Sequence, residues 1–188
     1  MSARTSEPSD IREESLIAAA ELLGRLLLRE VEGRDLERLR DPGVSQALEQ
    51  LGIALPSVSE ESEWLEQRAA EYHDHFLRPD PGPLVQSLWT EGRYEGDSAV
   101  RLRQLASTAG FEYERTASRG AAIDHLGAIL LLWCAAQPGN ELLGNEIAAH
   151  HLKWADAPLA KIQGSGGFYG AVAASTRELL RAIAETTP

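Results

Sequence analysis

Hydrophobic residues recur with helical spacing along most of the chain. The strongest pattern begins near Ala122 and is the most apolar run in the sequence. Its inward positions follow the i, i+3, i+4, i+7 spacing of one helix face, namely Leu126, Ile129, Leu130 and Trp133. Leucines fill much of the other side, and a helix that is apolar nearly all round is usually buried. We therefore predict that this segment is the central helix of the fold.

Further amphipathic segments predict helices on both sides of this run. We expect them over residues 10–32, 35–40, 44–51, 57–78, 97–109, 140–151, 154–162 and 168–185. Ser57 and Glu60 have the spacing of a capping box, and Asn140 is a favourable N-cap residue. Gly33 is expected to end the first helix. No segment has a convincing strand pattern, so we predict an all-α helical bundle.

Residues 79–96 are predicted to form a long ordered loop. Pro79, Pro81 and Pro83 cannot continue the preceding helix. The segment is nevertheless too apolar for a free linker, and long loops inside compact domains are often functional. Trp89 in this segment has two interpretations, as a core residue or as the lining of a groove.

The length and composition indicate one domain. We expect a disordered tail over residues 1–9, which are polar and lack periodicity, and a single helical domain over residues 10–188. No apolar run reaches the roughly 18 residues that a membrane-spanning helix needs, and the first ten residues show no secretory signal. The single cysteine, Cys134, allows no intrachain disulfide, which favours a cytoplasmic protein.

The charge is strongly acidic, with a net value of −11 from 29 acidic and 18 basic residues. Such a surface repels phosphate backbones, which argues against nucleic-acid binding. It attracts cationic peptides or proteins. Solubility alone is the other interpretation of this charge.

Asp124 and His125 are the candidate functional residues at the start of the central helix. We expect Asp124 in the first helical turn, where a negative charge meets the helix dipole favourably. Gly127 and Ala128 would then share its face, leaving either a cavity or room for a closely packed neighbour. Neighbours on a helix point about 100° apart, so the two residues cannot orient each other as in a catalytic triad. They are either a helix start or the polar floor of a binding site.

Metal, nucleotide and hydrolase chemistry find little support. His73 and His75 are two residues apart and His150 and His151 are adjacent, so neither pair shares a helix face. Gly164–Gly167 lacks the Lys and Ser or Thr of a phosphate-binding loop and is interpreted as a hinge. There is no nucleophile elbow motif. We predict no catalytic residues, no metal site and no cofactor.

Four stretches together resemble the TorD/DmsD family of cytoplasmic redox-enzyme maturation chaperones. Their order and spacing cover about residues 60–185. They are Glu71–Leu77, Pro81–Trp89 with Gly96-Asp97-Ser98, Asp124–Gly127 with the leucine run, and His151–Trp154 with Phe168-Tyr169.

The resemblance implies a helical chaperone without catalytic activity. Such chaperones bind the twin-arginine signal peptide of a molybdoenzyme catalytic subunit and delay export until the molybdopterin cofactor is loaded. The Asp124 carboxylate would pair with an arginine, and aromatic side chains would cover the apolar part of the peptide. The implied signal-peptide-binding residues are Tyr72, Phe76, Ser87, Leu88, Trp89, Gly96, Asp124 and His125.

The sequence leaves other functions and the oligomeric state open. A non-catalytic helical interaction or regulatory module with another partner would also fit the pattern. A monomer and a domain-swapped dimer are both compatible with the breaks at Pro138-Gly139 and Gly164–Gly167. The sequence names neither the client enzyme nor a role for a guanine nucleotide.

Overall fold

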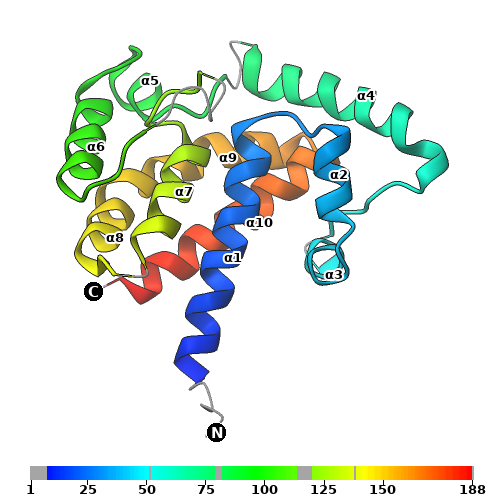
Figure 1. Ribbon diagram of the computed structural model, residues 1–188. Helices are drawn as coiled ribbons and strands as arrows, with labels where there is room; N and C mark the ends of the chain where they lie inside the picture. Colours follow the sequence, from blue (N-terminus) through cyan, green and yellow to red (C-terminus); the bar gives the residue numbers. More distant parts are fainter. Residues whose placement is uncertain (1–7, 51, 79–81, 114–119, 138, 188) are drawn as a thin grey trace, which may run out of the picture.

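The computed structural model describes residues 8–50, 52–78, 82–113, 120–137 and 139–187. Within these ranges the regular structure is helical, apart from one isolated β-bridge between Val85 and His125. The all-α prediction is confirmed (Figure 1). The α-helices are α1 (Pro8–Leu28), α2 (Gly33–Leu39), α3 (Pro42–Gln50), α4 (Glu61–Tyr72), α5 (Gln86–Glu91), α6 (Asp97–Thr108), α7 (Leu126–Ala136), α8 (Glu141–Ile147), α9 (Asp156–Gly164) and α10 (Gly167–Thr186).

Short helices of other types join some of these elements. Two are π-helices that continue α4 and α8 directly, and two are 3₁₀-helices. They are Val58–Glu60 and Lys153–Ala155 (3₁₀), and His73–Leu77 and Ala148–Leu152 (π). Such π-turns inside helices are often found at functional sites.

The contact between α1 and α7 is the most extensive helix pair in the fold. A Cβ atom added at Gly127 would lie 2.5 Å from the carbonyl oxygen of Gly24, so the two backbones touch at these glycines. Leu126, Ile129 and Leu130 of α7 are fully buried. The predicted central helix is confirmed, and Gly127 makes room for a closely packed neighbour, α1.

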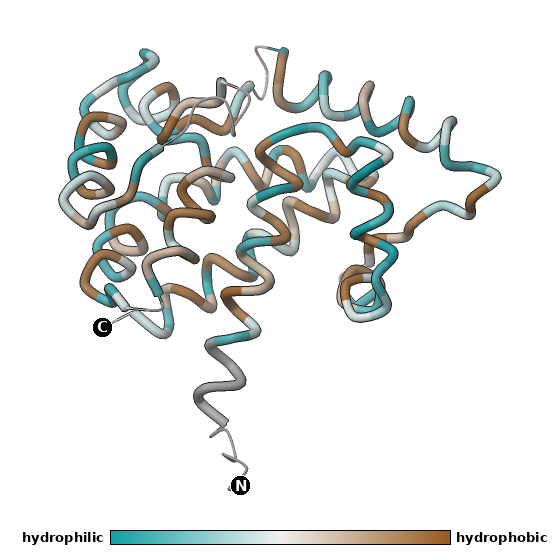
Figure 2. Tube along the Cα trace, in the orientation of Figure 1, coloured by the Kyte–Doolittle hydropathy of each residue, from teal (hydrophilic) through white to brown (hydrophobic). Residues whose placement is uncertain are grey.

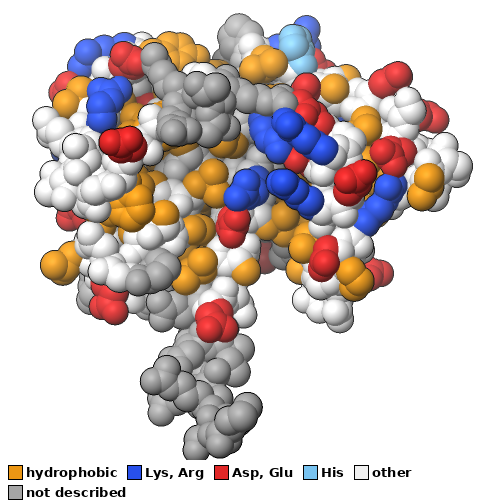
Figure 3. Space-filling view, viewed as in Figure 1, with side chains coloured by type: hydrophobic (Ala, Val, Ile, Leu, Met, Phe, Trp, Pro, Cys, Tyr) orange, Lys and Arg blue, Asp and Glu red, His pale blue; other side chains and the backbone are white. Residues whose placement is uncertain are grey.

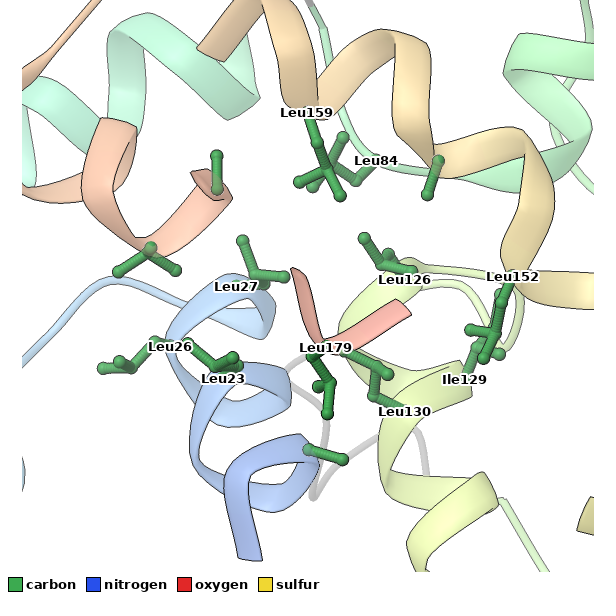
Figure 4. Close-up of a cluster of buried hydrophobic side chains, with 14 of the residues drawn as sticks. Leu23, Leu26, Leu27, Leu84, Leu126, Ile129, Leu130, Leu152, Leu159 and Leu179 are labelled. Carbon is green, nitrogen blue, oxygen red and sulfur yellow. The ribbon is translucent and has the colours of Figure 1, made fainter. Parts of the chain in front are cut away.

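The core is built mainly from leucines that several helices contribute. Figure 4 shows side chains of α1, α7 and α10 meeting, joined by Leu84, Leu152 and Leu159. Figure 2 shows hydrophobic residues recurring along each of these helices. Burying one such side chain stabilises the fold by about 1.5–3 kcal/mol. No helix in the described part of the chain is both long and apolar enough to cross a membrane.

The first helix differs from the prediction at both ends. It begins at Pro8, two residues before the predicted start at residue 10, and proline suits the first position of a helix. Residues 1–7 lie outside the described part. The helix ends at Leu28 rather than near residue 32, and Gly33 begins α2 instead of ending α1. Asp35 is the reason, because its carboxylate accepts a hydrogen bond from the Glu32 amide and caps the new helix.

Two predictions around the proline-rich segment are also wrong. Gln86–Glu91 forms helix α5 inside the predicted loop. The central helix begins only at Leu126, so Asp124 lies before it and not in its first turn. His125 is the N-cap, and the Leu126 amide donates to the Leu84 carbonyl at 2.8 Å. This hydrogen bond from another segment occupies the first amide of α7 and fixes where the helix starts.

The other helix ends agree with the prediction to within a few residues. The Ser57 and Glu60 capping box is present. The Asn140 side chain accepts a hydrogen bond from the Leu143 amide at 3.2 Å and caps α8. The α2–α3 pair stands beside α1, and an ion pair between Arg40 and Glu61 at 2.8 Å ties it to the start of α4.

Candidate functional site

A cleft of about 670 Å³ lies where the end of α1 meets four other segments. Its walls are Leu28–Glu30, the end of α4 with its π-turn, Pro83 and Val85, Tyr94 and Glu95, and residues 120–122 with His125. The volume is typical of ligand pockets. Of the eight residues predicted to bind a peptide, three line it: Tyr72, Phe76 and His125.

Tyr72 and Phe76 form its aromatic wall. Their ring centroids are 4.8 Å apart, and the Tyr72 hydroxyl donates to the Leu27 carbonyl at 3.4 Å. The π-turn that continues α4 turns Phe76 and Leu77 toward the cleft. Leu77 is 63% exposed and Tyr94 is 57% exposed, so the rim offers apolar surface to a partner.

The negative side of the cleft is formed by Glu30 and the C-terminal end of α1. No hydrogen bond or ion pair of the Glu30 carboxylate occurs within the described residues. Burial and, secondarily, the charge of Glu30 raise the pKa of Tyr72 to about 12. The carboxyl end of a helix carries partial negative charge. Arg29 is already paired with Asp35. The Glu30 carboxylate and the C-terminal end of α1 therefore make this corner of the cleft suited to a cation.

His125 lies at the back of the cleft and is neutral. Burial lowers the pKa of its imidazole to about 4, although the nearby Asp124 charge acts in the opposite direction. Its Nδ1 accepts a hydrogen bond from the Gly127 amide at 3.2 Å, so the ring proton is assigned to Nε2. His125 therefore caps α7 and lines the cleft at the same time.

Asp124 and Ser87 lie behind the cleft rather than in it. Asp124 is fully buried, and its Oδ2 accepts a hydrogen bond from the Ser87 amide at 2.8 Å. Its backbone carbonyl accepts from the Gln86 amide at 2.9 Å. These two bonds cap the N-terminus of α5. The other carboxylate oxygen, Oδ1, and the Ser87 hydroxyl are buried without a partner.

Gln86 connects this cap to a second buried histidine. The Gln86 amide group donates to the His150 carbonyl at 3.0 Å, so its oxygen faces Nδ1 of His151 at 2.8 Å. Nδ1 of His151 is therefore the donor. Burial is the main cause that lowers the pKa of His151 to about 4. The turn that carries Asp124 and His125 is thus held through α5 to the π-turn after α8.

The remaining predicted residues lie outside the cleft lining. Trp89 and Leu88 are half-buried in α5, and the Trp89 indole donates to the Pro83 carbonyl at 2.9 Å. Lys161 of α9 lies 5.5 Å from the centre of the Trp89 ring. Gly96 is the N-cap of α6, where Glu91 accepts hydrogen bonds from two α6 amides. A Cβ added at Gly96 would contact the Glu91 carboxylate, so a larger residue there would displace this capping side chain.

Glu30 is not among the predicted site residues. The hydrophobic pattern predicts a continuous helix through Glu30, whereas α1 ends two residues earlier. The spacing of Glu32 and Asp35 at the start of α2 was the available signal. Tyr94 is likewise absent from the predicted site residues, although it lines the cleft. The described residues contain no group of three or more His, Cys, Asp or Glu side chains that could hold a metal ion.

Comparison with protein families gives one result that bears on this site. Residues 37–157, more than half of the chain, match the family model described as nitrate reductase delta subunit. This family consists of redox-enzyme maturation chaperones that act with molybdoenzyme subunits. Comparisons with curated proteins and with solved structures gave no match. The chain belongs to the nitrate reductase delta subunit family of redox-enzyme maturation chaperones, which confirms the predicted family resemblance.

Proposed function

We propose that the protein is a cytoplasmic chaperone that binds the twin-arginine signal peptide of a molybdoenzyme catalytic subunit. It would assist cofactor loading before export and have no catalytic activity or cofactor of its own. The observation that carries the proposal is the open cleft. It combines an aromatic wall with a carboxylate at a helix C-terminus.

An arginine of the peptide would enter beside Glu30. The guanidinium would be attracted by the Glu30 carboxylate and by the negative end of the α1 dipole. The faces of Tyr72 and Tyr94 would add cation–π attraction. The net charge of −11 would draw the cationic peptide toward the protein from a distance.

Three of the eight residues implied by the family resemblance keep a direct role in this proposal. Tyr72 would contact the peptide with the buried Phe76 packed behind it in the same wall, and the Nε2–H of His125 would donate to one of the peptide carbonyls. The other five would act indirectly, by shaping α5 and the two turns beside the cleft. They are Ser87, Leu88, Trp89, Gly96 and Asp124.

Titration calorimetry with twin-arginine signal peptides from molybdoenzymes of the same genome would test the proposal. We expect one peptide to bind and its variant with both arginines replaced by alanine to bind much more weakly. Glu30→Gln should weaken binding by about tenfold or more, because charge-assisted hydrogen bonds contribute about 1.5–3 kcal/mol. Glu178→Gln is the matched control, since Glu178 is an exposed carboxylate of α10 away from the cleft.

Two results would change the assignment. Binding that depends on the arginines but not on Glu30 would keep the function and move the arginine contact elsewhere. If none of the peptides binds, the signal-peptide proposal fails. The chain would then be a helical interaction or regulatory module that recognises another part of its partner.

A further inference from the structure

A second concave surface lies along α1, on the side facing α2 and α3. This α1–α3 groove has a volume of about 390 Å³. On α1 its apolar residues are spaced by four, so they form one stripe along the helix. The apolar lining is Ala18, Leu22, Leu26, Val31, Leu39 and Val44.

The groove is continuous with the cleft at the end of α1. Arg29 and Glu30 line both of them. Figure 3 shows Lys and Arg side chains gathered over the upper part of α1 and over α2, with hydrophobic atoms beside them. A ligand whose cationic end contacts Glu30 in the cleft can therefore extend directly into the groove.

The charges around the groove favour an uncharged occupant. Three arginines and three carboxylates line it, so their formal charges cancel. Arg25 is paired with Glu21 at 2.8 Å, and Arg29 is paired with Asp35. An apolar helical segment binds such a surface by burying its hydrophobic face against it. A strongly acidic or basic segment would find no net charge to balance its own.

We propose that the α1–α3 groove binds the apolar segment that follows the two arginines of the signal peptide. This inference rests on the proposed function and deepens it. Glu30 lies at the junction, with the arginines on its cleft side and the apolar segment on its groove side. The peptide would therefore run from the cleft along α1, away from Tyr72.

A third concave surface on the opposite side of α1 is the competing location. It is lined by residues of α7 such as Ala128, Leu131 and Leu132 and has a volume of about 450 Å³. It shares Leu28 and Arg29 with the cleft but not Glu30. Because we assign the arginine contact to Glu30, the segment next to the arginines reaches the α1–α3 groove first.

Photo-crosslinking with the wild-type protein would locate the apolar segment without any variant. The probe is the binding signal peptide with a photoreactive leucine analogue placed in its apolar segment. We expect crosslinks to residues 39–44 of the α2–α3 pair. Crosslinks to residues 128–135 of α7 would overturn the proposal, because they would place the segment on the opposite side of α1. Crosslinks to Leu22 or Leu26, which form the α1 side of the groove, would support the proposal as well, whereas crosslinks to residues that do not line the groove would overturn it.

A matched pair of valine variants would measure the contribution of the groove. Val44→Glu puts a charge into the groove at the third position of α3, where an acidic residue suits the helix. Val58→Glu makes the same change at a residue that is 79% exposed and lies outside the groove. We expect Val44→Glu to weaken binding of the whole peptide by about tenfold or more and Val58→Glu to leave it unchanged.

A short peptide that ends directly after the arginines separates this inference from the function. It should bind both valine variants and the wild type with equal affinity. If the arginines are required but both valine variants bind the whole peptide as the wild type does, only the groove assignment fails. If no peptide binds the wild type, the proposed function fails and the groove assignment fails with it. Melting curves of each variant confirm that it is folded.

Discussion

The carboxylate of Asp124 accepts a hydrogen bond from the backbone amide of Ser87, 37 positions earlier in the chain, at 2.8 Å. This contact lets a six-residue helix form directly after a segment that contains three prolines. It also places Asp124 at 0% exposure, with no surface for an incoming arginine. In this conformation Asp124 is a cap that holds two segments together.

We therefore expect Asp124→Ala to destabilise the protein by about 2 kcal/mol. The substitution removes a buried hydrogen bond to a charged group and leaves the Ser87 amide without its partner. Asp124→Asn keeps an acceptor oxygen and should lose less. Urea unfolding measures both, with Asp74→Ala as a control at an exposed carboxylate. A stable Asp124→Ala protein that has lost peptide affinity would instead assign Asp124 to the binding surface.

The α1–α7 crossing should be highly sensitive to a single methyl group. Gly127→Ala would place a carbon 2.5 Å from the Gly24 carbonyl oxygen and 3.0 Å from the Leu28 backbone nitrogen. Since backbone atoms cannot move aside cheaply, we expect a loss of at least about 2 kcal/mol. Gly164→Ala is the matched control, because an added methyl group there meets no atom within 4 Å. It should be neutral or stabilising by up to about 1 kcal/mol. Equal melting temperatures for the two variants would contradict this packing.

We expect the folded protein to lose stability in mild acid because two of its histidines are buried. The folded state holds His125 with a pKa of about 4, whereas an exposed histidine has a pKa of about 6.5. Between these values the unfolded chain binds more protons, so the free energy of unfolding falls as the pH falls from about 6.5 to about 4. The loss reaches about 3 kcal/mol for this residue at the lower end. His151 adds a loss in the same window.

His125→Asn tests the origin of this pH dependence. Asparagine keeps a capping acceptor for α7 but does not titrate. Its free energy of unfolding, measured between pH 7 and pH 4, should fall less steeply than that of the wild type. A profile that superimposes on the wild type would show that His125 has the same pKa in the folded and the unfolded chain.

Trp89 is expected to affect stability more than peptide binding. Trp89→Phe removes the hydrogen bond from the indole to the Pro83 carbonyl and should cost about 1 kcal/mol. Because the ring packs toward Lys161 and not into the cleft, peptide affinity should change less than with Glu30→Gln. Chemical unfolding and calorimetry on the same preparation separate the two effects. A large loss of affinity at unchanged stability would argue that Trp89 touches the peptide.

The sequence by itself determined the helical class, most helix bounds and the family. These features depend on local patterns: the apolar spacing around Leu130, the capping residues Ser57 and Asn140, and the short motifs at Tyr72 and His125. Three of the residues named as candidates do meet in one cleft. Local patterns suffice here because a helix is stabilised by neighbours within four positions and by one buried face.

Only the tertiary structure decided that α5 exists, where α7 starts, and which charge faces the cleft. The amides of Ser87 and Leu126 are satisfied by Asp124 and Leu84, partners that lie 37 and 42 positions away in the sequence. No local pattern records such partners. Glu30 reaches the cleft because α1 ends two residues before it, at a point where the chain turns into α2. The acidic corner of the site therefore comes from the packing of distant segments.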